Sequence, residues 1–395
     1  MRILALAYTN YSSDPRVLRE AEAFAQAGDE IDVFCLRKPG EKPKEQVRGV
    51  TIRHLPIKKY QGNSTLQYII SYFSFMIVAF LYVTLFFIIK RYKIIHIHTM
   101  PDFLIFAAVV PRICGAKLVL DMHDLMPEVY EAKFGSGGFY WSFMILVEKL
   151  STKFAHHIIT VHEPYVELIK SRGVHTNKIT AILNVPEQEI FHPRTVKPGN
   201  PFTVIYSGTI AKRNGIDIFL HALNILKKDD LPIRFLLIGD GDDLPKIKKL
   251  AADLQLGDTL QLNEGFVDVR ELPSYIQMAH MAVIPLRADT AMRYALPVKL
   301  MEYVSMEVPV VISYLETISA YFDDDMVSFV PPENIFALAD AVKRLYLSKQ
   351  LRDRLARNAS RFTKTHNWDL EREKLYKVFD LLIDDYSSLK PGNES

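Results

Sequence analysis

Two short stretches in the first half of the sequence hold side chains that could do chemistry. They are HIHTMPDF, residues 96–103, and LVLDMHDLMPEVY, residues 118–130, and in both of them polar residues follow an apolar run. An imidazole beside carboxylates can orient a polar substrate or transfer protons. We therefore take His123, Asp124 and Glu128 as candidate catalytic residues.

The histidines of these stretches are also compatible with a metal site. His96 and His98 share one face of a strand because side chains alternate along it, and His123 follows a neighbouring strand. However, the strand ends precede different loops, and no carboxylate stands at a recognised ligand spacing. We expect no bound metal, and a packed imidazole stays an alternative for each histidine.

A third stretch, YSGTIAKRNG, indicates a phosphate site in the second half of the chain. It ends a strand at Gly208, supplies Lys212 and Arg213, and begins a helix near Gly215. A glycine turn, a cation and the N-terminus of a helix together can hold a phosphate.

A fourth stretch, RYALPVKLMEYVSMEVPVV, adds a second helix start. Pro297 opens this helix, and its first turns carry Lys299 and Glu302. The helix amides and Lys299 could hold a phosphate, while Glu302 could bind a ribose diol. Nearby, IGDGDDLP could be an acidic metal-nucleotide motif, but we favour a tight turn with Asp243 capping the next helix.

The elements that must position these residues alternate along the whole chain. In the first helix Asp14 can cap, Pro15 suits the first position and Gly28 can end it. Alternating strands and helices favour parallel sheets covered on both faces. The expected strands are 2–8, 30–37, 50–56, 94–99, 117–123, 156–162 and 179–183, then 202–207, 233–239, 259–262, 281–285, 308–313 and 327–330.

This pattern predicts an α/β protein of two doubly wound, Rossmann-like domains that face a cleft. The first domain covers residues 1–185, a proline-rich linker covers 186–201, and the second domain covers 202–366. Residues 367–386 are expected to form a last helix and 387–395 a flexible tail. Ligands of such sheets bind beyond the carboxyl ends of the strands, and several of these stretches fall at such ends.

Composition narrows the class of protein. The 395 residues include 48 basic and 46 acidic side chains, so the strong basic excess of a nucleic-acid binder is missing. Cys35 and Cys114 are too few for a disulfide framework or a thiolate metal site, which favours a reducing compartment. The N-terminal run MRILALAY is too short for a signal peptide and is expected to be a strand.

Residues 66–89, LQYIISYFSFMIVAFLYVTLFFII, depart from the globular pattern because they carry no charge. A helix of about 36 Å could cross a bilayer, but it would then separate strands of one sheet. The alternatives are burial against the sheet and a position in the membrane interface, which we favour because the second half is apolar all round. The flanking cations that suit an anionic lipid surface are Lys58, Lys59, Lys90, Arg91 and Lys93.

Six segments, taken in order, resemble the GT-B glycosyltransferases of family 4, and most closely the bacterial members that build cell-surface polysaccharides. The segments are DPRVLREAEAFAQAGDEIDVF, HIHTMPDFL, LDMHDLMPEVY, YSGTIAKRNGIDI, GFVDVRELPSYIQMAH and ALPVKLMEYVSMEVPVVIS. The resemblance covers about residues 1–385. It implies a retaining, metal-independent transfer of a sugar from a nucleotide donor, with the acceptor in the first domain, the donor in the second, and a last helix that crosses back to the first.

The resemblance also assigns roles to single residues. His123 matches the histidine near the donor sugar, Arg213 a basic residue on the donor diphosphate, and Glu302 the second glutamate of a pair, which grips the ribose. Two positions depart from the family pattern. Tyr294 stands where the first glutamate of the pair is usual, and Asn214 stands where many members have a second phosphate-binding lysine.

We therefore expect a glycosyltransferase that moves a sugar, with retention, from a UDP- or GDP-sugar to a lipid-linked saccharide in surface polysaccharide synthesis. We expect no cofactor and a peripheral or monotopic position on the cytoplasmic face of the inner membrane. The expected donor site comprises Gly208, Thr209, Lys212, Arg213, Gly239, Phe266, Val267, Leu296, Pro297, Val298, Lys299 and Glu302. The expected acceptor side comprises Asp14, Arg16 and His98.

Two other functions remain alternatives. A nucleotide-sugar epimerase can use the same two domains, but it needs acid-base carboxylates, for which Glu128 is the candidate. A non-catalytic partner subunit that binds nucleotide sugar and membrane is favoured by the departures at Tyr294 and Asn214.

Overall fold

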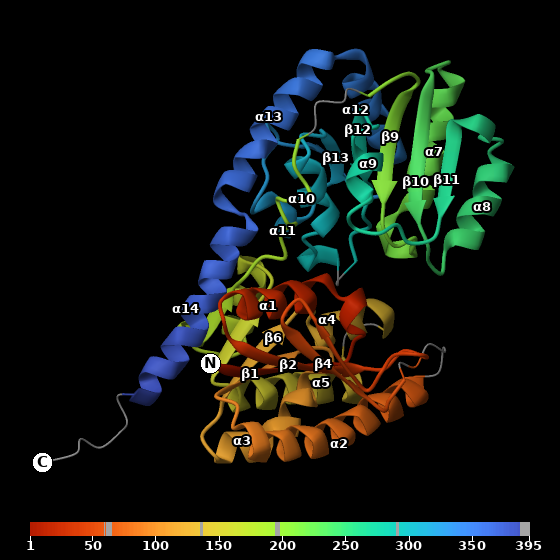
Figure 1. Ribbon diagram of the computed structural model, residues 1–395. Helices are drawn as coiled ribbons and strands as arrows, with labels where there is room; N and C mark the ends of the chain where they lie inside the picture. Colours follow the sequence, from red (N-terminus) through yellow and green to blue (C-terminus); the bar gives the residue numbers. More distant parts are fainter. Residues whose placement is uncertain (59, 61–64, 135–136, 194–197, 290–291, 388–395) are drawn as a thin grey trace, which may run out of the picture. The chain divides into compact units, whose positions relative to one another are not determined.

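The computed structural model describes residues 1–58, 60, 65–134, 137–193, 198–289 and 292–387. The chain divides into two compact units (Figure 1). Unit 1 comprises Met1–Asn184 together with the chain from Glu371, and unit 2 comprises Val185–Leu370. Each unit is built on its own sheet, so the prediction of two α/β domains is confirmed.

Unit 1 contains an eight-stranded sheet in the order β3-β4-β2-β1-β5-β6-β7-β8. All neighbouring strands are parallel except β3 and β4. The strands are β1 Arg2–Ala7, β2 Glu30–Leu36, β3 Lys44–Val47, β4 Val50–Leu55, β5 Ile94–His98, β6 Lys117–Met122, β7 His157–Thr160 and β8 Ile179–Ala181. Seven of these were predicted, and their apolar runs are buried as expected.

The sequence did not predict β3, a short and mostly exposed strand of polar residues at the edge of the sheet. Its position follows from a two-residue turn, because Arg48 (φ 47°) and Gly49 (φ 85°) both adopt positive φ. Such turns close antiparallel hairpins, and Val47 accordingly pairs with Val50.

Helix α1, Pro15–Gln26, begins as predicted. The Asp14 side chain accepts a hydrogen bond from the Val17 amide at 3.3 Å, and Gly28 follows the helix with φ 85°. The remaining helices of this part of the chain are η1 Tyr11–Ser13, α2 Thr65–Lys90, η2 Asp102–Ala108, α3 Val109–Ile113, α4 Met126–Phe134, α5 Gly138–Phe154, α6 Glu163–Ser171 and η3 Thr176–Lys178.

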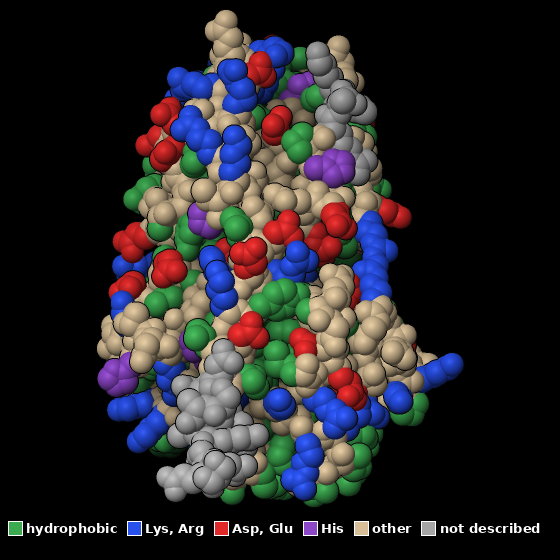
Figure 2. Space-filling model, turned by 60° about the vertical axis from the view of Figure 1, so that its left-hand side comes forward, with side chains coloured by type: hydrophobic (Ala, Val, Ile, Leu, Met, Phe, Trp, Pro, Cys, Tyr) green, Lys and Arg blue, Asp and Glu red, His purple; other side chains and the backbone are tan. Residues whose placement is uncertain are grey.

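Helix α2 contains the uncharged stretch and is buried on one face only. One face, with Phe75, Ala79, Val83 and Phe87, packs into unit 1, whereas the opposite face is exposed along its length. By length and composition alone, Gln67–Lys90 could cross a membrane. The exposed large side chains are Ile69, Ile70, Phe73, Ile77, Leu81, Leu85, Ile88 and Ile89. Figure 2 shows hydrophobic side chains along the lower rim of the face in view, close to Lys and Arg side chains.

Unit 2 contains a six-stranded parallel sheet in the order β11-β10-β9-β12-β13-β14. The strands are β9 Phe202–Ser207, β10 Ile233–Gly239, β11 Leu260–Glu264, β12 Met281–Ile284, β13 Val310–Ser313 and β14 Ser328–Val330, all within two residues of the predicted ends. The helices are η4 Lys212–Asn214, α7 Ile216–Lys228, α8 Leu244–Asp253, η5 Gly257–Thr259, α9 Leu272–Ile276, η6 Met292–Tyr294, α10 Val298–Ser305, α11 Glu316–Ser319, α12 Ile335–Leu347 and α13 Lys349–Thr365. Strand order reverses between β9 and β12, and ligands of such sheets bind at that switch point.

The last helix, α14 Trp368–Ser387, joins unit 1 from Glu371 onward. The Glu371 carboxylate accepts a hydrogen bond from the Leu183 amide at 2.9 Å, and the Tyr376 hydroxyl donates to the Ala23 carbonyl at 2.7 Å. Phe379 packs on Phe24 with ring centroids 4.4 Å apart. Residues 388–395, part of the expected tail, lie outside the described residues.

Candidate functional site

A buried ion pair lies beneath the carboxyl end of the sheet in unit 1. Asp121 stands on β6 with no exposed surface, and its two carboxylate oxygens accept hydrogen bonds from the Arg16 guanidinium at 2.9 and 3.0 Å. Arg16 also donates to the Ile182 carbonyl at 2.9 Å. The Arg16 guanidinium, predicted for the acceptor side, is therefore committed to partners inside the unit.

Two histidine rings contact the Asp121 carboxylate. His98 Nδ1 and His123 Nε2 are each 3.3 Å from Asp121 Oδ2 and 3.1 Å from one another. The His123 side chain is 18% exposed, whereas that of His98 is 2% exposed, so His123 is the one of the pair that a substrate can touch. Burial opposes its charge, but the Asp121 carboxylate outweighs burial and raises the pKa of His123. Asp121, itself fixed by Arg16, thus holds and polarises the candidate catalytic imidazole.

Glu20, His96, His98 and Asp121 form the one group of metal-ligating types found among the described residues. Their ligand atoms lie within 4.8 Å of one another. The Arg16 guanidinium, however, donates to both Asp121 oxygens and lies 3.2 Å from Glu20, so a fixed protein cation already neutralises these carboxylates. Burial also raises the pKa of Glu20, which favours its protonated form, a poor ligand for a cation. These residues do not fit a divalent ion while Arg16 is in place.

The other candidate residues of unit 1 lie in different surroundings. Asp124 is exposed next to His123, and Asp14 caps α1. Glu128 is buried in an ion pair with Arg172, which also donates to Glu148 at 2.5 Å. The structure thus places Glu128 in a buried ion-pair network that is not apparent from the sequence, because Glu148 and Arg172 lie far along the chain.

In unit 2 the loops after β9 and β10 contact one another, and the Lys299 side chain lies against the first of them. Gly208 and Gly239 have φ 122° and 144°, and a Cβ at Gly239 would lie 1.9 Å from the Gly208 carbonyl oxygen. A Cβ at Gly208 would lie 2.9 Å from Lys299 Nζ. Only glycine fits these two positions, so the predicted Gly208, Gly239 and Lys299 do come together in space.

We call the group formed by Gly208, Gly239 and Lys299 the cradle. Its central cation, Lys299, comes from the first turn of α10. Its Nζ donates to the Tyr206 hydroxyl at 2.5 Å and lies 3.8 Å from the ring centroid. Burial, with a smaller effect of the Arg213 charge, lowers the pKa of Lys299 to about 7, against the attraction of Glu302. Burial likewise raises the pKa of Glu302 to about 7, despite Lys299. Both groups therefore titrate near neutral pH, and a bound anion would recharge Lys299.

The remaining predicted donor residues surround this cradle. Lys212 and Arg213 are exposed in η4, after β9, and Pro297 precedes α10 in an extended conformation. Asn214, in contrast, is buried and donates to the Thr209 carbonyl at 2.7 Å. Asn214 therefore stabilises the loop after β9, because its side-chain amide is occupied by the Thr209 carbonyl. Leu296 and Val298 are partly buried beside Pro297.

An exposed aromatic side chain follows β11. Phe266 is 79% exposed, and the preceding Gly265 amide donates to the Gly239 carbonyl at 3.2 Å, which places Phe266 one strand away from the cradle. Val267 beside it is partly buried. An exposed ring at this edge can stack on a nucleobase. Tyr294 is partly buried beside Arg293, which pairs with Glu316 at 2.8 Å.

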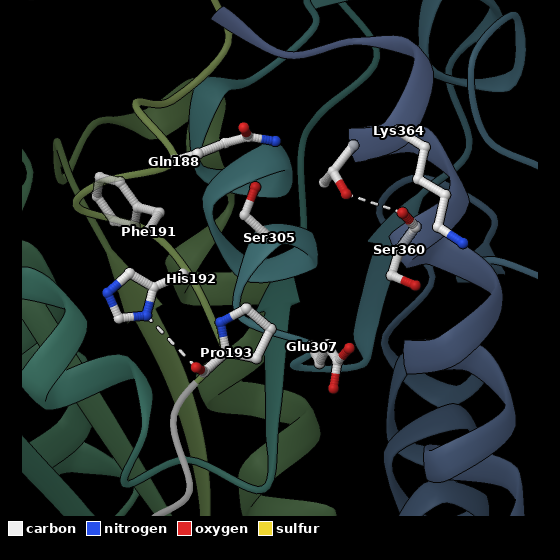
Figure 3. Close-up of a pocket in the computed structure, with 9 residues that line it drawn as sticks. Gln188, Phe191, His192, Pro193, Ser305, Glu307, Ser360 and Lys364 are labelled. Carbon is white, nitrogen blue, oxygen red and sulfur yellow. Dashed lines mark hydrogen bonds between the residues drawn. The ribbon is translucent and has the colours of Figure 1, made fainter.

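A pocket of about 240 Å³ in unit 2 is separate from the cradle (Figure 3). It lies at the C-terminal ends of α10 and α13, with Ser305, Glu307 and Lys364 in its wall. Since α10 is about 12 Å long, this pocket is a helix length away from Lys299. None of the residues predicted for chemistry lines it.

Proton uptake on diphosphate binding tests the assignment of Lys299. At pH 8 the free side chain is mostly neutral, so binding of UDP should take up close to one proton, whereas at pH 6 Lys299 is already charged and contributes little. Calorimetric titration of UDP in buffers with different heats of ionisation measures this uptake. The variant Glu302→Gln removes the other group that titrates near pH 7, and it should still take up a proton on binding at pH 8. If this variant takes up no proton, the uptake belongs to Glu302 and not to Lys299.

Comparisons with known proteins cover both units. The family described as "Glycosyl transferase 4-like domain" matches residues 13–184, and "Glycosyl transferases group 1" matches residues 187–362. Alpha-D-kanosaminyltransferase of Streptomyces kanamyceticus is 29% identical over 158 residues, 40% of this chain and 39% of that protein. The putative colanic acid biosynthesis glycosyltransferase WcaL of Escherichia coli K12 is 24% identical over 180 residues, 45% of this chain and 44% of that protein. These alignments thus span less than half of each relative.

Two solved structures share the fold over nearly the whole chain. Sucrose-phosphate synthase of Thermosynechococcus elongatus has a TM-score of 0.80 at 18% identity and covers 98% of this chain and 100% of its own. Anabaena Alr3699/HepE, solved in complex with UDP, has a TM-score of 0.71 at 13% identity and covers 96% of this chain and 100% of its own. At these identities the likeness concerns the fold alone.

Proposed function

Because the chain belongs to the GT-B glycosyltransferases of family 4, we propose that it transfers a sugar from a nucleoside-diphosphate sugar to a saccharide in polysaccharide synthesis. The observation that carries this proposal is the cradle at the switch point of the unit 2 sheet. There Lys299 and the α10 N-terminus meet the glycine turns at Gly208 and Gly239. These groups have the charge and shape that a diphosphate requires.

The proposed donor is a UDP-sugar. A similar structure was solved with UDP, and Phe266 offers a ring on which a base can stack. Glu302, one turn after Lys299 on α10, is proposed to accept hydrogen bonds from the ribose hydroxyls. The half-charged state of Lys299 near pH 7 suits this role, because an incoming diphosphate raises its pKa and fixes its proton.

The proposed reaction retains the configuration at the anomeric carbon. The bond from that carbon to the diphosphate oxygen breaks with its electron pair on the diphosphate, and the acceptor oxygen bonds to the same face. The acceptor proton passes to the leaving diphosphate. Arg213, Lys299 and the α10 amides stabilise the negative charge that develops there. His123, held by Asp121, is proposed to orient the donor sugar.

The proposed reaction needs no metal ion, because protein cations supply the charge that a divalent ion would bring to the diphosphate. The epimerase alternative is weakened because its candidate base, Glu128, is paired with Arg172 inside the unit. The non-catalytic alternative rested partly on Asn214, whose buried amide has a structural partner in the Thr209 carbonyl.

The proposed acceptor is a lipid-linked saccharide, and the proposed location is the cytoplasmic face of the inner membrane. The exposed apolar face of α2 supports this location. Of the predicted flanking cations, Lys58, Arg91 and Lys93 are exposed, whereas Lys90 pairs with Glu30 at 2.6 Å and Asp32 at 2.8 Å. Lys59 lies outside the described residues.

A transfer assay tests the proposed function. Purified full-length protein is incubated with UDP- and GDP-sugars and a bacterial lipid extract in excess EDTA, and the product is analysed by NMR. We expect transfer from one donor, an anomeric configuration equal to that of the donor, and a rate unchanged by added Mg²⁺. An inverted product would contradict retention. Turnover that appears only with Mg²⁺ would contradict the metal-independent cradle.

A further inference from the structure

The exposed apolar surface of unit 1 extends beyond α2. Helix α5 exposes large side chains at intervals of three and four residues, so they line one side of it. Ile113, at the end of α3, is 80% exposed. The segment η2 packs against both α2 and α5, so α2, α3 and α5 belong to one layer over the sheet (Figure 1). The exposed side chains of α5 are Phe139, Tyr140, Phe143, Leu146 and Leu150.

Five cations lie near the amino ends of the strands: three stand at the starts of β5, β6 and β8, and two stand in the last turns of α3 and α5. We call them the basic rim: Lys93, Arg112, Lys117, Lys153 and Lys178. The Lys117 amide donates to the Lys93 carbonyl at 2.9 Å, and Lys178 Nζ donates to the Thr152 carbonyl at 2.7 Å, which brings the rim together. Within the described part of the chain, no carboxylate lies within 4.0 Å of these five side-chain nitrogens.

The cations of the basic rim disfavour further positive charge on the groups around them. Burial, followed by the charges of Arg112, Lys117 and Lys178, lowers the pKa of His156 to about 4. Burial and the charge of Arg112 also lower the pKa of Lys178. An anion bound at the rim would relieve this repulsion.

An open pocket of about 340 Å³ joins the rim to the apolar layer. Its walls are Phe106, Leu150 and Phe154, and its cations are Arg112 and Lys153. The Arg112 guanidinium is fixed in place, because its Nε donates to the Phe154 carbonyl at 2.9 Å and its carbon lies 4.5 Å from the centroid of the Phe154 ring. A pocket with two cations and hydrocarbon walls fits a group that is anionic at one end and apolar at the other.

We propose that this pocket binds the phosphate of an anionic phospholipid, whose acyl chains lie along the exposed faces of α3 and α5. The proposal rests on the proposed membrane location and adds a lipid class and a binding site to it. Charge complementarity supports this occupant, because hydrophobic side chains adjoin Arg112 and Lys153, which have no carboxylate partner within the described residues; hydrophobic and cationic side chains also lie close together on the lower rim of Figure 2.

The position of the pocket separates it from the acceptor site. Lys117 of the basic rim begins β6, whereas His123 follows the end of that strand. Six residues of extended chain span about 20 Å. A diphosphate-linked acceptor in this pocket would therefore be far from the candidate catalytic imidazole, so the site is one for anchoring.

Vesicle sedimentation of the full chain tests the proposal. Vesicles of pure phosphatidylcholine are compared with vesicles of equal parts phosphatidylcholine and phosphatidylglycerol. Wild-type protein should prefer the anionic vesicles, and Lys153→Glu and Arg112→Gln/Lys153→Glu should lose about tenfold or more of that partitioning, since each cation near the surface contributes about fivefold. Lys42→Glu, an exposed cation in the loop before β3, is the matched control and should partition like wild type.

The outcomes separate this proposal from the proposed membrane location. If wild type sediments with neither kind of vesicle, both the proposed membrane location and the proposed lipid site are wrong. If wild type prefers anionic vesicles and both pocket variants match Lys42→Glu, the location stands and the pocket is overturned. A second readout uses Trp141 of α5, which Trp368→Phe leaves as the sole tryptophan. Brominated acyl chains should quench Trp141 fluorescence, and Lys153→Glu should abolish the quenching; equal quenching in both proteins would contradict the proposal.

Discussion

Lys299→Met is expected to lower kcat/KM for the nucleotide sugar by about a hundredfold or more, which is the usual cost of removing one group that stabilises developing negative charge. Lys299 Nζ lies over Gly208 and donates to Tyr206, at the centre of the proposed diphosphate cradle. Methionine keeps the length of the side chain and its apolar packing but removes the charge. Steady-state kinetics with the donor identified in the transfer assay provides the measurement.

Thermal unfolding distinguishes lost function from lost fold in this variant. Folding lowers the pKa of Lys299 from 10.5 to about 7, so burial of this lysine costs free energy of folding. The cost is complete below pH 7 and disappears as the pH rises towards 10.5. Lys299→Met should therefore leave Tm at pH 7 unchanged or raise it. The control Lys228→Met, an exposed cation on α7, should change neither Tm nor kcat/KM. Activity close to wild type in Lys299→Met would contradict the assigned role.

Asp121→Asn should have the largest effect on stability, about 3–5 kcal/mol, because it removes the carboxylate that accepts two hydrogen bonds from the buried Arg16 guanidinium and leaves Glu20, at 3.2 Å, as its remaining carboxylate neighbour. For a domain of this size the expected decrease in Tm of unit 1 is about 10 °C. Burial opposes ionisation of Asp121, but Arg16, His123 and His98 together outweigh burial and hold the pKa of Asp121 well below 3.8. Its contribution is therefore complete above pH 4 and is lost in acid, so wild type and variant should converge as the pH falls.

Two further variants identify the cause of this loss. The exposed neighbour Asp124→Asn should have a Tm within about 1 °C of wild type, because surface substitutions cost little. The double variant Arg16→Met/Asp121→Leu replaces a buried ion pair by apolar groups and should be more stable than Asp121→Asn. In Asp121→Asn the pKa of His123, followed by NMR, should fall, because Asp121 is what raises it. An unchanged pKa of His123 would contradict the proposal that Asp121 polarises this imidazole.

The sequence predicted the elements well, because apolar runs of strand length and helix signals such as Asp14-Pro15 are local properties of the chain. It did not predict β3, whose pairing depends on the turn at Arg48 and Gly49 rather than on an apolar pattern. The exposed side of α5 was also missed. Its apolar residues are compatible with a buried helix until the packing of η2 and the sheet shows which side is covered.

The site was predicted only in part, for a related reason. Residue types and strand ends pointed to His123, Arg213 and Lys299. The ion pair between Arg16 and Asp121 joins residues 105 positions apart, and no spacing predicts such a contact. One signal was present, however. A carboxylate within the buried strand LVLDM needs a cation as a partner, although its position in the sequence does not show which one.

Calorimetric titration of UDP and GDP into the full-length protein, without metal, tests the cradle most directly. We expect that one of the two diphosphates, UDP, binds wild type at one site, and that Lys299→Met weakens this binding by about tenfold or more. If neither diphosphate binds wild type, or if Lys299→Met binds as tightly as wild type, the assignment of the donor site to Gly208, Gly239 and Lys299 is wrong.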